Sequence, residues 1–161
     1  MPWVEYPREP DLYFDLHSQE CWSKDMMPAV ERDEWQERIK GSDVPIYCHP
    51  TRLYLFKNAK PFPYDGVHAL SPHRFFENTI AYQLAFALFS HRQEPVGEVA
   101  LYGVNMMGKR EYLWERASVM YWAGVLHGNG INITVPEGSA FFMSYWIAGR
   151  YGETSEKRFQ V

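Results

Sequence analysis

A single α/β domain with a mainly parallel sheet is the fold class that the sequence predicts. The first observation is a strand, helix, strand succession: an apolar run at 97–104, a helical pattern over about 110–127, and "INITVP" at 131–136. With these lengths the succession is a βαβ unit, whose strands are parallel and whose crossover is right-handed. The second observation is size, because 161 residues with 46% apolar content suit one domain with one core. We therefore expect residues 1–161 to form one domain.

The N-terminal half adds two further strands and a surface helix. "DLYFDLH" (11–17) alternates in part, and "VPIYCH" (44–49) is a short apolar run, so both are expected as strands. The segment 27–41 has a proline near its start, apolar residues spaced among charges and a glycine at its end, which predicts a helix. Four prolines divide 50–75, which we expect to be mostly loop, with "RLYLF" (52–56) as a candidate edge strand.

Two helices are expected in the C-terminal half. The run "FENTIAYQLAFALFSHRQE" has apolar residues at helical spacing, and either Asn78 or Thr79 suits its N-cap. In the helix over about 110–127, one stripe of small and medium side chains is expected to pack on the sheet: Leu113, Ala117, Met120 and Gly124. A second apolar face of this helix contains Trp114, Tyr121 and Val125. Either that face is an oligomer or partner surface, or residues 140–151 cover it, and periodicity does not separate the two.

Composition narrows the function classes. The formal net charge is −4 and the pI is about 5.9, so no basic surface for nucleic acid is expected. Cys21 and Cys48 have no C-x-x-C spacing, which favours reduced thiols in a cytosolic protein, although the spacing does not exclude their pairing. The chain opens without a signal-peptide pattern, and its longest apolar stretch, 79–89, is too short to span a bilayer. A soluble protein without membrane contact is therefore expected.

Candidate ligand-binding residues follow the two strands of the βαβ unit. The run Val99 to Tyr102 is apolar without alternation, which suits a strand covered on both faces. Asn105 comes next, at the carboxyl end of that strand, a common ligand position in parallel sheets. Glu137 and Ser139, in "PEGS", follow the second strand, where they either line the same crevice or form a turn.

The first two strands also bring polar residues to their ends. Asp15 and His17 are two apart, so their side chains share one face of the strand, and His49 ends the next strand. Zinc needs three or four ligands in tight geometry, and no H-x-H or H-E-x-x-H motif is present. We therefore predict no metal site, and expect the histidines to be held by hydrogen bonds, with Asp15 and His17 retained as ligand-binding candidates.

The helix starts supply the remaining candidates. Asn78 and Thr79 either bind a phosphate or serve as an ordinary N-cap. Glu111 lies in the first turn of its helix, where its charge suits the dipole, and Tyr112 and Arg116 are one turn apart. Arg116 either neutralises a ligand's charge or forms a structural salt bridge.

The order of these motifs resembles a known family. The segments "ENTIAYQLAFAL", "EVALYGVNM", "EYLWERAS", "GINITVPEGS" and "RYGE" are similar to uncharacterised Rossmann-like proteins of tailed bacteriophages and prophages. In that family the strand reads I-x-L-Y-G-V-D-M, followed by E-Y-x-x-Q-R-P, a helix, G-I-x-V-x-I-P-x-x-S and Y-G. "DLYFDLH" and "VPIYCH" look like its middle strands, so the similarity spans nearly the whole chain. The resemblance implies a three-layer Rossmann-like fold and a location in the host cytoplasm or the virion.

A more distant similarity concerns the ligand. The strand and the helix start resemble the nucleotide-handling cores of bacterial sialyltransferases and hydroxymethylpterin diphosphokinase-like proteins, which implies a nucleotide or nucleotide-sugar ligand. Two departures count against catalysis: the chain has no G-x-G-x-x-G or P-loop, and Asn105 replaces the family's Asp. Asparagine keeps the hydrogen bonds and loses the charge, so binding is expected there rather than base chemistry.

The expected function is therefore a nucleotide-type small-molecule site at the carboxyl ends of the strands, with no cofactor identified. The alternative is a non-catalytic phage virion, assembly or accessory protein that keeps the scaffold without an active site. Both hypotheses are compatible with a homo-oligomer or with a phage protein as partner. Fold alone does not decide between them.

Overall fold

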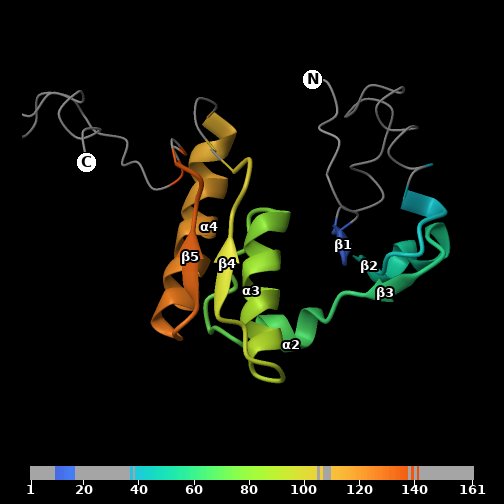
Figure 1. The fold of residues 1–161 in the computed structure, drawn as a ribbon, viewed down its shortest axis with the longest axis horizontal. Coiled ribbons are helices and arrows are strands. Elements are labelled where there is room, and N and C mark those ends of the chain that lie inside the picture. The colour runs from blue at the N-terminus through green and yellow to red at the C-terminus, as the bar shows by residue number, and fades with distance from the viewer. Residues whose placement is uncertain are drawn as a thin grey trace, which may run out of the picture.

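Residues described by the computed structural model are 10–16, 37, 39–104, 106, 110–137, 139 and 141. This part of the chain combines helices with short parallel strands, which confirms the α/β class (Figure 1). In chain order the elements are β1 (Tyr13–Asp15), β2 (Ile46–Cys48), the 3₁₀ helix η2 (Pro50–Leu55), β3 (Ala59–Pro61), α2 (Tyr64–His68), α3 (Thr79–His91), β4 (Glu98–Ala100), α4 (Arg110–Gly128) and β5 (Asn132–Thr134).

The first sheet has the order β1-β2-β3, with all three strands parallel and Asp15, Cys48 and Pro61 in register. β1 and β2 were expected, whereas the prediction for residues 52–56 was wrong. "RLYLF" lies mostly within η2, which begins with a proline, the residue whose missing N–H suits a first helical turn. The third strand follows it, and its proline is tolerated because β3 lies at a sheet edge. Of the helix predicted over 27–41, residues 37, 39 and 40 are helical and most of the rest lies outside the described residues.

The second sheet pairs β4 with β5 in parallel, and α4 connects them, so the predicted βαβ unit is confirmed. In Figure 1 both strands lie on one side of α3 and α4. Val99 and Ile133 pack against the core, while the residues on either side of each are exposed. The expectation of a strand covered on both faces is therefore wrong for β4 within the described residues. Its outer face carries Glu98 and Ala100, a polar and a small residue that tolerate water.

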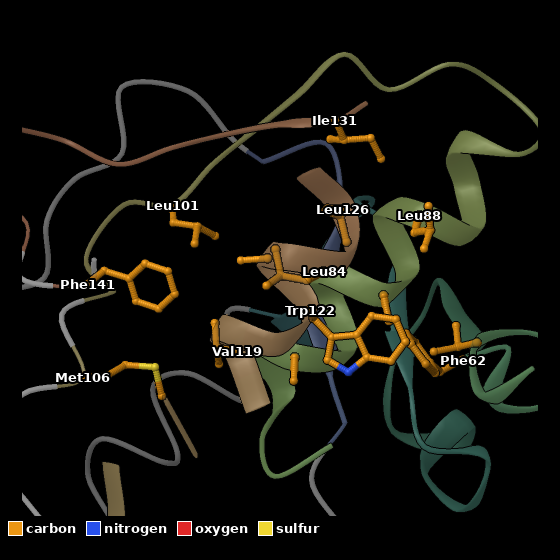
Figure 2. Packing of buried hydrophobic residues seen from close by; sticks show 14 residues of the cluster. Phe62, Leu84, Leu88, Leu101, Met106, Val119, Trp122, Leu126, Ile131 and Phe141 are labelled. Carbon is orange, nitrogen blue, oxygen red and sulfur yellow. The ribbon is translucent and has the colours of Figure 1, made fainter. Parts of the chain in front are cut away.

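α3 starts where a cap was predicted. Asn78 is the N-cap, and its side-chain oxygen accepts a hydrogen bond from the Ala81 N–H at 2.9 Å. This bond satisfies one of the free N–H groups of the first turn, which explains the helix boundary. α3 packs on α4, and buried side chains of both helices form the main core with those of the second sheet (Figure 2).

The buried stripe of α4 differs from the predicted one. Ala117, Met120 and Gly124 are exposed, and the side chain of Leu113 lies outside the described residues. The side chains that α4 buries in the core are Val119, Trp122, Ala123 and Leu126. Burying the large indole removes far more apolar area from water than burying alanine and glycine, so the helix turns its tryptophan inward.

Aromatic rings join the first sheet to α3. The ring of Phe86 on α3 lies 5.4 Å from that of Phe14 on β1 and 4.8 Å from that of Tyr47 on β2, measured between centroids. Phe62, just after β3, contacts the same ring at 5.7 Å. α3 therefore packs against the first sheet through these rings, and it shares the main core with Val99 and Ile133 of the second sheet.

Candidate functional site

Several predicted site residues gather around the first half of α4. Asn78 Nδ2 donates a hydrogen bond to Glu115 Oε2 at 3.3 Å, and the N–H of Glu77 donates to Ser118 Oγ at 3.1 Å. The start of α3 is thereby fixed against α4. Thr79, the first residue of α3, lies at the same place and is half-buried.

Arg116 connects α4 to the segment that follows β5. Its Nε donates to the backbone carbonyl oxygen of Phe141 at 3.1 Å, and its Nη2 donates to the same oxygen. Ser139 Oγ accepts a hydrogen bond from the Phe141 N–H at 3.3 Å. Arg116 is only 9% exposed, so this guanidinium has left water for a backbone partner. Glu137, by contrast, is exposed beyond the end of β5.

Other candidates are placed only in part. Glu111 and Tyr112 belong to the first turn of α4, with side chains outside the described residues. His17 and Asn105 also lie outside the described residues. The structure thus brings Asn78 and Thr79, at the start of α3, close to the first half of α4. Arg116 lies in that half of α4 and contacts Phe141, which follows β5.

Asp15 belongs to a different environment, at the carboxyl end of β1. Its Oδ2 lies 2.6 Å from Arg52 Nη1, and both side chains are essentially inaccessible to water. The Arg52 guanidinium also lies 5.6 Å from the centre of the Phe56 ring. Sequence reasoning missed Arg52, although one cation within the apolar run "RLYLF" was a usable signal. A buried carboxylate needs a nearby cation, and the helix after β2 supplies it.

Nearby ionisable groups are held in their neutral forms. Burial raises the pKa of the Cys48 thiol, the Asp15 carboxylate raises it further, and Arg52 opposes the change. Burial, followed by the neighbouring Tyr82, raises the pKa of Tyr64 to about 12. Neither a thiolate nor a phenolate is therefore available at neutral pH, which disfavours nucleophilic chemistry by these groups.

His49 acts as a cap. Its Nδ1 lies 2.7 Å from Thr51 Oγ1 and accepts a hydrogen bond from the Thr51 N–H, at the start of η2. Within the described ranges, no group of three or more His, Cys, Asp or Glu side chains is placed so that it could hold a metal ion. None of the helices in this part of the chain has the length and apolar character of a membrane span.

Comparison of the chain with protein-family models, with curated proteins and with solved structures gave no match.

Proposed function

We propose that the chain is a phage-type Rossmann-like protein that binds a nucleotide or a nucleotide-derived small molecule at the carboxyl ends of its parallel strands. The observation that carries the proposal is the strand connectivity. The first sheet runs β1-β2-β3, and the chain then returns through α3 to a second parallel pair, β4-β5. In the structure β1 and β4 belong to separate sheets. Joining the two sheets edge to edge at these strands would give the order 3-2-1-4-5, the doubly wound order of three-layer nucleotide-binding folds.

In that order the direction of winding changes between β1 and β4. Ligands of doubly wound sheets bind at this point, beyond the carboxyl ends of the strands. Asn105 follows β4 in the sequence, Thr79 is the first residue of α3, and Arg116 lies in the first half of α4. We assign Thr79 to a phosphate, Asn105 to a sugar hydroxyl and Arg116 to the ligand's negative charge. Asp15 is assigned a structural role, because Arg52 already neutralises it.

A thermal-shift screen tests the proposal. The chain is heated with ATP, GTP, UDP-glucose and CMP at millimolar concentration, and Tm is compared with the ligand-free value. A ligand present at a hundred times its Kd stabilises the folded state by about 2.7 kcal/mol, a shift of several degrees. Asn105→Ala and Thr79→Val should reduce that shift. Asn132→Ala, at the amino end of β5, and Ser90→Ala, in the last turn of α3, are matched controls that should preserve it.

Two results would contradict the assignment. A shift that all four variants keep in full would place the ligand elsewhere on the chain. The absence of any shift with these compounds would remove the support for a nucleotide-type ligand.

The second candidate is a non-catalytic virion, assembly or accessory protein, and the exposed face of α4 favours it. Trp114 is 71% exposed, and from Trp114 to Gly128 no exposed residue is an Asp, Glu, Lys or Arg. Solvent-facing helix surfaces normally carry such charges, whereas interfaces are enriched in aromatic residues and depleted of charge at their centre. Size-exclusion chromatography with light scattering tests this candidate. It predicts that the parent chain is an oligomer and that Trp114→Glu dissociates it. A monomeric parent chain, or an oligomer that Trp114→Glu leaves intact, would contradict it.

A further inference from the structure

We propose that Asn129, directly after α4, is a site of spontaneous deamidation, and that the last turn of α4 controls how fast it reacts. Of the five asparagines in the sequence, Asn129 alone precedes a glycine. Glycine has no side chain to hinder the approach of its backbone nitrogen to the asparagine side chain, so this pair of residues reacts most readily. Asn129 and Gly130 are both exposed, so water and hydroxide reach them.

The way in which α4 ends requires this glycine. The N–H of Gly130 donates to the His127 carbonyl at 3.0 Å, and Gly130 has a φ of 82°, a left-handed conformation that other residues disfavour. The N–H of Ile131 donates to the Leu126 carbonyl at 3.1 Å, which completes a Schellman motif. Both of these apolar side chains are fully buried in the main core, as Figure 2 shows. The turn from α4 into β5 therefore fixes the reactive glycine in place.

Asn129 also contributes to this helix end. Its Nδ2 donates to the Val125 carbonyl at 2.8 Å. Its backbone N–H donates to the carbonyls of Val125 and Leu126, at 3.2 and 2.9 Å. The amide side chain thus supplies an extra donor near the end of α4, where carbonyl groups run out of intrahelical partners. Moving the side chain away from this position costs one hydrogen bond.

Deamidation begins when the backbone nitrogen of Gly130 attacks Cγ of Asn129. That nitrogen gives its proton to hydroxide, a new C–N bond forms, the Cγ–Nδ2 bond breaks, and the side-chain nitrogen leaves as ammonia with a proton from water. The product of this step is a succinimide ring. One water molecule then adds to either carbonyl of the ring and opens it to aspartate or isoaspartate. Overall, one water is consumed and one ammonia is released.

The folded structure slows the first step. The attacking nitrogen is held by the His127 carbonyl, and the amide under attack is held by the Val125 carbonyl. Both hydrogen bonds must break before the two groups meet. Residues 127–130 are all exposed, and exposed helix ends open locally at low cost. Fraying of the last turn of α4 therefore sets the rate of deamidation.

The product does not suit the helix end in which it forms. A carboxylate has no proton to donate to the Val125 carbonyl, and its negative charge lies at the negative end of the α4 dipole. Isoaspartate also adds a methylene group to the backbone between α4 and Ile131, which displaces this buried side chain from its place in the core. Deamidation therefore weakens the connection between α4 and β5.

Peptide mapping by mass spectrometry tests the site in the full chain, incubated at pH 8.5 and 37 °C with and without guanidinium chloride. Conversion should be fastest at Asn129. Asn58 and Asn132 are internal controls, because alanine and isoleucine follow them in the sequence. Denaturant should accelerate the reaction at Asn129 by about tenfold, since the two hydrogen bonds no longer oppose it.

Thermal unfolding tests the consequence for stability. Asn129→Asp should lower Tm by several degrees, and Asn129→Ala by less, because alanine loses the bond to the Val125 carbonyl without adding a charge. Asn129→Gln is the control for ageing. Glutamine keeps an amide but closes a larger ring much more slowly, so the incubated variant should keep its own Tm while the incubated parent chain loses several degrees.

Each part of the proposal has a result that overturns it. An Asn129 that stays intact while Asn58 or Asn132 is converted would overturn the site. Equal rates with and without denaturant would overturn the control by the last turn of α4. An Asn129→Asp variant as stable as the parent chain would overturn the predicted weakening. Should that variant fail to fold, the Tm of the incubated parent chain, compared with that of Asn129→Gln, carries the test.

Discussion

The two halves of the described structure are stabilised in different ways. The core of α3, α4 and the second sheet is almost wholly apolar, and Trp122 is fully buried in it. The first sheet packs Phe14, Tyr47 and Phe62 against that core, and it has a second, small core of its own, consisting of Ile39, Ile46, Cys48 and Phe56, with a fully buried ion pair beside it. One half is therefore stabilised by apolar area, and the other depends on two charges that must remain paired.

The difference predicts how each half responds to mutation. Truncating a buried apolar side chain lowers the free energy of unfolding in proportion to the atoms removed and the cavity left. A buried ion pair contributes little beyond an apolar pair of similar size, yet removal of one partner strands a charge away from water. The α3–α4 core should respond in a graded way, while the first sheet should respond sharply to Arg52 or Asp15 alone.

The largest effect is expected for Trp122→Ala, which tests the apolar half. Trp122 is fully buried, stacks on Phe76 with ring centroids 4.8 Å apart, and donates from Nε1 to the Phe75 carbonyl at 2.9 Å. Its truncation should lower the free energy of unfolding by about 3–5 kcal/mol in urea titrations. Trp114→Ala, on the exposed side of the same helix, should change it by less than about 0.5 kcal/mol. Equal losses would contradict the burial assigned to α4.

Arg52→Met tests the ion pair of the other half. The substitution leaves Asp15 buried beside the apolar core of the first sheet, and should cost about 3 kcal/mol of unfolding free energy. The double variant Asp15→Leu with Arg52→Met removes both charges, and should recover most of that loss. A double-mutant cycle in urea measures the coupling. Additive losses would show that the two residues act independently.

How far the sequence predicts this structure depends on the kind of signal. The start of α3 follows from local chemistry, because Asn78 offers its oxygen to a nearby N–H, and the βαβ unit follows from the succession of apolar runs. β3 was missed because two of its three residues are Lys60 and Pro61, whose strand conformation comes from pairing with β2. Local propensity is overridden there by the neighbouring strand.

The candidate site shows the same limit. Arg116 was singled out from its position in α4, but its bond to the Phe141 carbonyl depends on a contact between residues 25 apart. Arg52 was overlooked because it lies in η2 and its partner, Asp15, lies on β1, far away in the sequence. Long-range pairing of polar groups leaves no period in the sequence, so pattern analysis identified the carboxylate without its partner.

A smaller effect is expected at Gly66, where α2 packs on α3. A Cβ added at Gly66 would lie 2.5 Å from Cε2 of Phe89, closer than two carbon atoms can pack. Gly66→Ala should therefore destabilise the fold by about 1–2 kcal/mol. Gly124→Ala is the matched control, since open space surrounds that helical position, and it should stabilise by about 0.5–1 kcal/mol. The urea midpoint of each variant is compared with that of the parent chain. Shifts in the same direction for both variants would contradict this packing.

The smallest effect concerns Tyr64, which lies between the two halves: its ring contacts His49 after β2 and Tyr82 on α3. Its pKa is raised to about 12 in the folded state, from 10.0 for an unperturbed tyrosine. Between these values the unfolded chain releases the proton and the folded chain keeps it, so stability is present below pH 10 and falls as pH rises toward 12. Burial raises the pKa of Tyr82 as well, so Tyr64→Phe should reduce the slope of stability against pH without abolishing it.

Urea midpoints at pH 9, 10 and 11 measure that slope. Tyr54→Phe is the control, because Tyr54 is 72% exposed and its removal should leave the slope unchanged. The comparison is informative because burial is the main cause of the raised pKa, and the rings of Phe62, after β3, and Tyr82, on α3, pack against the Tyr64 ring. A slope that Tyr64→Phe leaves intact would mean that the Tyr64 hydroxyl is hydrated in solution, and that the two halves meet less tightly at α2 than their aromatic contacts indicate.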